Sequence, residues 1–138
     1  MKKILETERL LLREFELSDT AFIVTLLNTP TWLRFIGDKN VKTLTDAKKY
    51  LETGPLQSYI DYGYGLWAIQ HKTNNFRIGM CGLVNRKGLA DIDIGFALLP
   101  QFAGKGYGFE AASATMQYAK QHLNIPRVIA ITLSLIHI

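Results

Sequence analysis

Three glycines at alternate positions, Gly104, Gly106 and Gly108, mark the segment of this sequence whose residue types are best suited to chemistry. They lie between an alternating apolar segment and a helix-like segment, so the turn opens onto N–H groups that lack helical partners and carry partial positive charge. Such a turn binds anions. Glycine places no Cβ in the way of a phosphate, and Lys105 adds a cation. Glycines also form tight turns for structural reasons alone, but this context favours a diphosphate site.

Two common phosphate-binding patterns do not fit this turn. A nucleotide triphosphatase loop requires glycine where Leu99 stands, and Ser or Thr where Gly106 stands. The dinucleotide fingerprint requires a third glycine where Phe109 stands, and an acidic residue near positions 124–127, where none occurs. The turn therefore indicates neither a triphosphatase nor a Rossmann domain.

The elements on either side of the turn follow from hydrophobic periodicity. Residues 90–99 alternate apolar with small or acidic side chains, which predicts a strand that ends at Pro100. Residues 109–123 repeat apolar residues at helical spacing, and the predicted inner face holds Ala112, Met116, Ala119 and Leu123. A last strand at 127–132 must then lie parallel to the strand at 90–99, through a right-handed crossover.

The remaining predicted elements precede this unit. In chain order they are a strand at 9–15, a helix at 20–28, a helix from Thr43 or Thr45 to Gly54, and an antiparallel hairpin of strands at 66–69 and 76–84. The second helix carries Leu44, Ala47 and Leu51 on one side. Residues 57–61 show no clear pattern. The order β-α-α-β-β-β-α-β predicts an α/β fold with a mixed sheet.

Length and composition limit the classes of protein that fit. The 138 residues suffice for one domain, which we expect to span 1–138, and a charged fraction of 20% is typical of soluble globular chains. The formal charge of +4 is spread along the chain, which argues against a nucleic-acid partner. No signal peptide, membrane-length apolar run or metal-binding Cys/His spacing occurs, and the single cysteine cannot form an internal disulfide. We therefore expect a cytoplasmic protein with no membrane partner and no metal.

The turn resembles the cofactor motif of the GNAT superfamily of acyl-coenzyme A N-acyltransferases. In that motif Arg or Gln precedes Gly by three positions, and Gly or Ala follows two positions later; Gln101, Gly104 and Gly106 fill it. Further segments are similar to the subfamily that includes the N-terminal alanine acetyltransferases of ribosomal proteins, namely 6–13, 78–83, 93–96, Pro100 and 110–111. The resemblance thus covers the chain from residue 6 to residue 132.

The resemblance implies acetyl-CoA as co-substrate and a primary amine as acceptor, on a small molecule or at a protein N-terminus. In the family, the strand before the turn pairs through its backbone with the pantetheine arm, which corresponds here to Phe96, Ala97 and Leu98. The pyrophosphate would be held by the turn, chiefly by its N–H groups, at Gln101, Phe102, Ala103, Gly104, Lys105, Gly106, Tyr107 and Gly108. The amine attacks the thioester directly, so the reaction needs a proton acceptor and N–H donors for the oxyanion.

Asp93 is the candidate for the proton acceptor. It lies in the same strand as the implied pantetheine contact, on the face opposite Ile94 and Phe96, where the resembling subfamily often has an acidic residue. It could take the ammonium proton directly or through water, or could anchor the amine by its charge. A surface aspartate on an alternating strand is the alternative interpretation. Asp91 is a weaker second candidate.

Other reactive side chains receive no catalytic role. Cys81 lies among apolar residues and glycines, without a neighbour that would lower its pKa, so we expect a buried structural cysteine. His71, His122 and His137 have no spacing that suggests a ligand set or a proton relay. Trp32, in the predicted loop after the first helix, is a candidate substrate contact.

The C-terminal residues depart from the family pattern. Members continue past the strand at 127–132 with a helix and two strands, which supply an Asn to the cofactor arm and a Tyr to the departing thiolate. Residues 133–138 contain neither, so we expect a C-terminally incomplete domain. An uncovered sheet edge would favour a homodimer. The alternatives to an active enzyme are a non-catalytic acyl-CoA-binding module or fragment, and a nucleotide-binding regulator.

Overall fold

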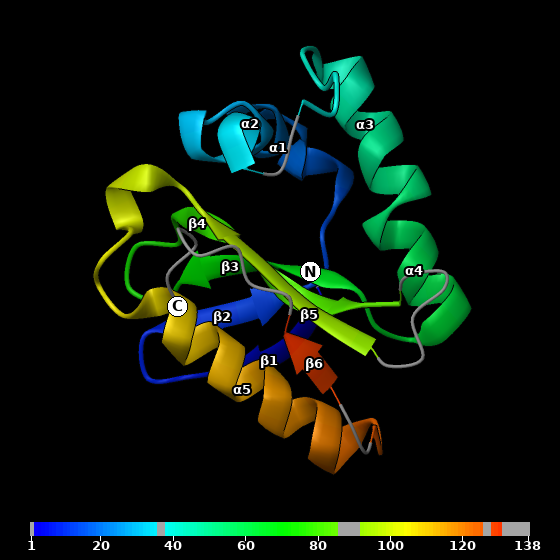
Figure 1. Ribbon diagram of the computed structural model, residues 1–138, viewed down its shortest axis with the longest axis vertical. Coiled ribbons are helices and arrows are strands. Elements are labelled where there is room, and N and C mark those ends of the chain that lie inside the picture. The colour runs from blue at the N-terminus through cyan, green and yellow to red at the C-terminus, as the bar shows by residue number, and fades with distance from the viewer. Residues whose placement is uncertain (1, 36–37, 86–91, 126–127, 131–138) are drawn as a thin grey trace.

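The chain folds into a six-stranded sheet with helices on both faces (Figure 1). The computed structural model describes residues 2–35, 38–85, 92–125 and 128–130. The strands are β1 (Lys3–Glu6), β2 (Leu10–Arg13), β3 (Leu66–His71), β4 (Arg77–Val84), β5 (Ile92–Leu98) and β6 (Val128–Ala130). They lie in the sheet in chain order, and each neighbouring pair is antiparallel except β5 and β6, which are parallel.

The helices fall into two groups. Those on one side of the sheet are α1 (Thr20–Leu27), α2 (Pro30–Phe35) and α3 (Leu44–Thr53), and α4 (Pro55–Tyr62) continues from α3 toward the start of β3 (Figure 1). On the other side, α5 (Tyr107–His122) links β5 to β6. Short 3-10 turns at Leu17–Asp19 and Pro100–Phe102 precede α1 and α5.

Both faces of the sheet are buried, by two clusters of apolar side chains. On the α5 side, α5 contributes small residues that pack on the strands, and the cluster includes Leu10, Trp67, Ile69, Cys81, Leu83, Ile94, Ala111, Ala112 and Ala119. On the other side, α1 and α3 pack on β3, β4 and β5 through Ile23, Leu26, Ala47, Leu51, Ala68, Met80 and Ala97. Because side chains alternate along a strand, Asp93 and Ala97 point to the α1–α3 side and Ile94 to the α5 side.

Local capping fixes the ends of α3 and α4. Thr43 Oγ1 accepts a hydrogen bond from the Asp46 N–H at 3.1 Å, and Asp46 Oδ2 accepts one from the Thr43 N–H at 3.3 Å, so the two residues form a capping box. Pro55 occupies the first turn of α4, where its missing N–H is not needed. Gly63 then ends that helix in the left-handed region, with φ +80°.

A buried charged cluster joins β2 to the turn before α1. Arg13 Nη2 lies 2.8 Å from Asp19 Oδ1, and these side chains are 2% and 0% exposed. Arg77 also donates to Asp19, and Gln70 accepts from Arg13 Nε at 3.0 Å. Burial alone would raise the pKa of Asp19, but hydrogen bonds from Arg13, the Glu16 backbone and Arg77 hold it below its ordinary value. The cluster is therefore a fully paired set of buried charges that fixes α1 against the sheet.

The predicted fold class is confirmed, together with the hairpin, the strand and helix around the glycine turn, and the parallel last strand. The predicted strand at 9–15 is the shorter β2, and β1, α2 and α4 were not predicted. Two residues of the predicted apolar helix faces, Leu44 and Met116, are 59% and 41% exposed. Thr115 and Ala111 occupy the buried side of α5 instead.

Candidate functional site

The glycine turn follows β5 and opens α5. Gly104 and Gly106 have φ angles of +76° and +83°, and Gly106 is the residue that precedes the first turn of α5. Residues with a side chain rarely adopt these angles, so the shape of the turn requires glycine at both positions. A Cβ placed on Gly104 would meet no atom within 4 Å, so the space in front of the turn is open.

The N–H groups of the turn divide into two sets. Phe102 N–H donates to the Leu99 carbonyl at 3.0 Å and Ala103 N–H to the Pro100 carbonyl at 3.1 Å. The predicted set of diphosphate donors therefore loses Phe102 and Ala103, because the 3-10 turn already satisfies them. The N–H groups of residues 104–109 have no acceptor among the described residues. They form a run of available donors at the turn and the start of α5.

One edge of β5 has no strand partner just before this turn among the described residues. β4 pairs with β5 along Asp93 to Leu98, whereas Val128–Ala130 of β6 pair with Ile92, Asp93 and Ile94. Among the described residues no strand pairs with that second edge beyond Ile94. Phe96, Ala97 and Leu98, the implied pantetheine contacts, lie in this stretch. Their backbone can therefore accept an extended ligand as a strand would.

Asp93 is buried on the α1–α3 side of the sheet. It pairs with Val84 of β4, and its exposure is 1%. The alternative that it is a surface residue is wrong, because helices cover both faces of this sheet. Asp93 is a buried carboxylate two residues before the stretch of β5 that has no described partner on one edge, which makes it a functional-site candidate. Asp91, the second candidate, lies outside the described residues.

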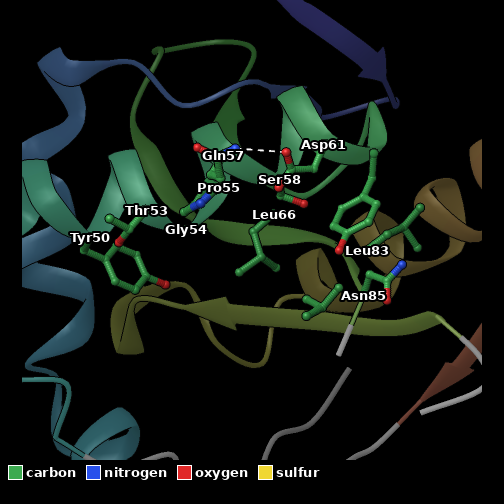
Figure 2. Close-up of a pocket in the computed structure, with 12 residues that line it drawn as sticks. Tyr50, Thr53, Gly54, Pro55, Gln57, Ser58, Asp61, Leu66, Leu83 and Asn85 are labelled. Atoms are coloured by element: carbon green, nitrogen blue, oxygen red, sulfur yellow. Dashed lines mark hydrogen bonds between the residues drawn. The ribbon is translucent and has the colours of Figure 1, made fainter. Parts of the chain in front are cut away.

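A pocket of about 250 Å³ opens between α3, α4 and the strands β3 and β4 (Figure 2). It is lined by Tyr50, Thr53, Gly54, Pro55, Gln57, Ser58, Asp61, Tyr62, Leu66, Leu83, Val84 and Asn85. Val84 is the residue opposite Asp93 in the strand pair, and residues directly opposite each other point to the same face. The pocket therefore reaches the strand-pair neighbour of Asp93, while Asp93 itself is buried and does not line it.

The charge of this pocket is negative. None of its described lining residues is Lys or Arg, and Asp61 contributes a carboxylate that accepts from Gln57 Nε2 at 2.9 Å (Figure 2). Burial raises the pKa of Tyr50 to about 12, so its hydroxyl stays protonated at neutral pH. The Asp61 carboxylate can thus attract a cationic amine. The protonated hydroxyl of Tyr50 can donate a hydrogen bond to a group next to that amine.

A second charged cluster connects the glycine turn to the N-terminal strands. Arg9 Nε lies 2.7 Å from Glu110 Oε1, and Arg9 Nη1 donates to the Lys105 carbonyl at 3.0 Å. Thr7 Oγ1 and the Arg9 N–H, at 3.0 Å, both donate to the other oxygen of Glu110. The guanidinium lies over the Tyr107 ring, 4.4 Å from its centroid. The segment between β1 and β2 is therefore tied to the start of α5.

The other reactive side chains do not assemble into a site. Cys81 is 0% exposed, and burial raises the pKa of its thiol to about 12, opposed only by a hydrogen bond with Thr115. It is a buried structural cysteine, as predicted. His71 packs on Tyr107 and His122 on Tyr118, whereas His137 lies outside the described residues. Within residues 2–35, 38–85, 92–125 and 128–130, no three His, Cys, Asp or Glu side chains gather as a metal site requires.

Trp32 does not lie in a loop. It belongs to α2 and is packed in the apolar cluster between the helices and the sheet, where it is 7% exposed. The structure therefore assigns it to the core rather than to a pocket wall. No described helix combines the length and the apolar character that crossing a bilayer would need.

Sequence comparison identifies relatives of this arrangement. Residues 9–135 match the acetyltransferase (GNAT) domain family. Over 124 residues the chain is 27% identical to the uncharacterized N-acetyltransferase YnaD of Bacillus subtilis, which covers 90% of this chain and 69% of that protein.

Solved structures share the fold. An acetyltransferase from Agrobacterium tumefaciens superimposes with a TM-score of 0.80 at 22% identity, over 98% of this chain and 76% of its own. The ribosomal alpha-N-protein acetyltransferase RimL, in complex with coenzyme A, gives a TM-score of 0.77 at 19% identity, over 94% of this chain and 73% of its own.

Proposed function

The chain belongs to the GNAT acetyltransferase family, and from this premise we propose that it acetylates the α-amine of a protein or peptide, with Asp93 as the proton acceptor. Acetyl transfer that depends on acetyl-CoA is the activity of this family. The acceptor and the roles of individual residues are the proposal. The observation that carries it is the stretch of β5 that, among the described residues, has no strand partner on one edge and leads into a turn with a row of available N–H groups.

The residues around β5 fit acetyl-CoA. The donors at 104–109, the left-handed glycines and the cation Lys105 suit a diphosphate, and the open backbone at Phe96–Leu98 suits the amide-bearing pantetheine arm. When bound there, acetyl-CoA supplies the thioester. Asp93 precedes Leu98 by five residues, or roughly 16 Å of strand. The thioester would therefore lie along β5 toward Asp93, away from the turn.

The acceptor would enter through the pocket beside α3 and α4. The carboxylate of Asp61 in its lining favours an ammonium, and Val84 of the lining is the strand-pair neighbour of Asp93. An amine attacks only after it loses its proton, so a carboxylate next to the amine can take that proton directly or through water. The buried position of Asp93 keeps bulk water away from this transfer.

A protein α-amine is favoured over a small amine by two observations. The pocket is open at the surface and small, so it suits the end of a chain whose remainder stays outside. In addition, RimL, a structural neighbour, is named as an alpha-N-protein acetyltransferase. A small polyamine or an amine-bearing antibiotic would fit the same charge but would not need the open rim.

Release of coenzyme A thiol in the presence of three acceptor sets tests this proposal. The sets are peptides with a free N-terminus, the same peptides with a blocked N-terminus and a free lysine, and small polyamines. We expect release with the first set only. Turnover restricted to polyamines would reject the protein acceptor, and no release with any set, despite acetyl-CoA binding, would reject catalysis.

The role of Asp93 has its own test. Asp93→Asn should lower kcat by about a hundredfold and leave the affinity for acetyl-CoA within twofold, because the carboxylate acts on the amine and not on the cofactor. Asp61→Asn is the matched control at the pocket rim, and it should raise the KM for the acceptor with little change in kcat. A normal kcat for Asp93→Asn would remove Asp93 from the reaction.

A further inference from the structure

Arg9 and Glu110 stand about a hundred residues apart in the chain, yet they are hydrogen-bonded to each other beside the glycine turn. Arg9 donates to the turn at the Lys105 carbonyl, through Nη1, and its guanidinium also lies over the Tyr107 ring. Glu110 in turn holds Arg9 by both its main-chain N–H and its Nε. Glu110 thus fixes Arg9, which follows β1 and precedes β2, and Arg9 in turn fixes the Lys105 carbonyl.

The contact at Lys105 determines the direction of the next N–H group. In a trans peptide the C=O and the N–H of the same plane point in opposite directions. When the Lys105 carbonyl is turned toward Arg9, the Gly106 N–H is turned away from Arg9. The orientation of one peptide plane therefore decides whether this donor faces a ligand.

Nothing else in the turn holds that plane. The plane rotates about φ of Gly106 and ψ of Lys105, and glycine tolerates both signs of φ, so the plane could rotate at low cost. Among the described residues the Lys105 carbonyl has Arg9 as its only donor. Space around Arg9 is limited, because Nη2 lies 3.3 Å from the position that a Cβ on Gly106 would take.

We propose that Arg9, anchored by Glu110, is a positioning residue that aims the Gly106 N–H at the diphosphate of acetyl-CoA. The proposal rests on the proposed function, since it assumes that the turn binds acetyl-CoA. Arg9 acts through the backbone of the turn, so its effect is confined to ligands that carry the diphosphate.

Glu110→Gln separates positioning from simple charge attraction. This change removes a negative charge next to an anion site, so electrostatics alone predicts tighter binding of acetyl-CoA. It also places an amide NH₂ against a donor from Thr7 or Arg9, which loosens the anchor. Positioning therefore predicts the opposite sign, which is weaker binding.

The experiment compares two acetyl donors in Arg9→Lys, Arg9→Gln and Glu110→Gln. Acetyl-CoA carries the diphosphate, and S-acetylpantetheine carries the same thioester without it. We expect the KM for acetyl-CoA to rise about tenfold in all three variants, which is the effect of losing one well-placed hydrogen bond, while kcat changes less than twofold. The KM for S-acetylpantetheine should not change. Arg9→Lys should fail to rescue, because an ammonium keeps the charge but lacks the planar fork that bridges Glu110 and Lys105.

Lys48→Gln is the matched control, since it removes one exposed positive charge from α3, far along the chain from the turn. It should leave both KM values unchanged. Full affinity in Arg9→Lys, tighter binding in Glu110→Gln, or equal losses with both donors would each overturn the positioning role. A wild-type chain that binds neither coenzyme A nor acetyl-CoA would instead overturn the proposed function itself.

Discussion

Two arginines at the ends of one short strand make similar ion pairs in very different surroundings. Arg13, at the end of β2, pairs with Asp19 at 2.8 Å, and the two side chains are 2% and 0% exposed. Arg9, just before β2, pairs with Glu110 at 2.7 Å, and these side chains are 40% and 19% exposed. Distance alone therefore does not tell the two clusters apart; burial does.

The two clusters differ in burial, and this difference gives them different roles. A buried charge that loses its partner is left in a medium that cannot solvate it, so the Arg13 cluster is tied to the stability of the whole fold. An exposed pair can exchange its partner for water, so the Arg9 cluster contributes little to stability. What it controls instead is the geometry of the turn. Substitutions in the two clusters should affect different measurements.

Asp19→Asn should have the largest effect, on stability. It leaves Arg13 and Arg77 without a counter-charge, one of them fully buried, and should lower the free energy of unfolding by about 3–5 kcal/mol. Urea denaturation measures this loss. Asp38→Asn, in an exposed pair with Lys42, is the control and should leave the midpoint unchanged. A loss below about 1 kcal/mol for Asp19→Asn would show that burial does not separate the clusters.

Gly104→Val tests the turn itself, without touching either ion pair. A β-branched residue is strained at φ +76°, and its side chain would enter the open space in front of the turn, so affinity for acetyl-CoA should fall by at least about a hundredfold. Gly104→Asn is the control for strain, because this chain already holds Asn40, Asn75 and Asn124 in the left-handed region. It should lose less affinity. Calorimetric titration that found wild-type affinity in Gly104→Val would remove the site assignment.

The contribution of the exposed cluster to stability should depend on pH, because it includes the carboxylate of Glu110. Burial alone would raise the pKa of Glu110, but the hydrogen bonds from Thr7 and Arg9 hold it below its ordinary value of 4.5. A lowered carboxylate pKa stabilises the fold above pH 4.5, and this contribution is lost as pH falls through the folded-state pKa. The difference in unfolding free energy between wild type and Glu110→Gln should be about 1 kcal/mol near neutral pH and should shrink in acid. A difference that does not depend on pH would contradict this.

The smallest effect on stability is expected for Arg9→Gln. Because Arg9 is 40% exposed, its loss should change the free energy of unfolding by less than about 1 kcal/mol. The affinity of the Arg9→Gln variant for acetyl-CoA should nevertheless fall. Thermal denaturation of Arg9→Gln beside Arg13→Gln gives the comparison directly, since both remove an arginine from the same strand region. Equal melting temperatures for the two variants would contradict it.

Local patterns predicted the part of the site that is made of backbone. The alternation in β5 and the glycines at 104 and 106 are contiguous in sequence, so the strand, the turn and the helix could be inferred together. In contrast, β1 and α2 span four and six residues, too few for a period to repeat. The second predicted helix was expected to end at Gly54, and Pro55, which can end one helix or begin another, begins α4 directly after it.

The part of the site that is made of side chains could not be predicted in the same way. Alternation placed Asp93 on the face opposite Ile94, but it could not show that α1 and α3 cover that face. Likewise, no local signal connects Arg9 to Glu110, because the contact depends on how α5 packs beside β1 and β2. The segments 6–13 and 110–111 carried the family resemblance, yet only the structure brings them together.

The lone thiol of this chain has a practical consequence. Cys81 is sealed beneath α5 and its pKa is raised to about 12 by burial, so thiol reagents cannot reach a reactive form of it while the sheet is intact. Any labelling of Cys81 must therefore wait for β4 and α5 to separate. The rate of labelling measures how often this opening occurs. A lower rate in the presence of acetyl-CoA would show that the bound ligand stabilises the sheet against opening.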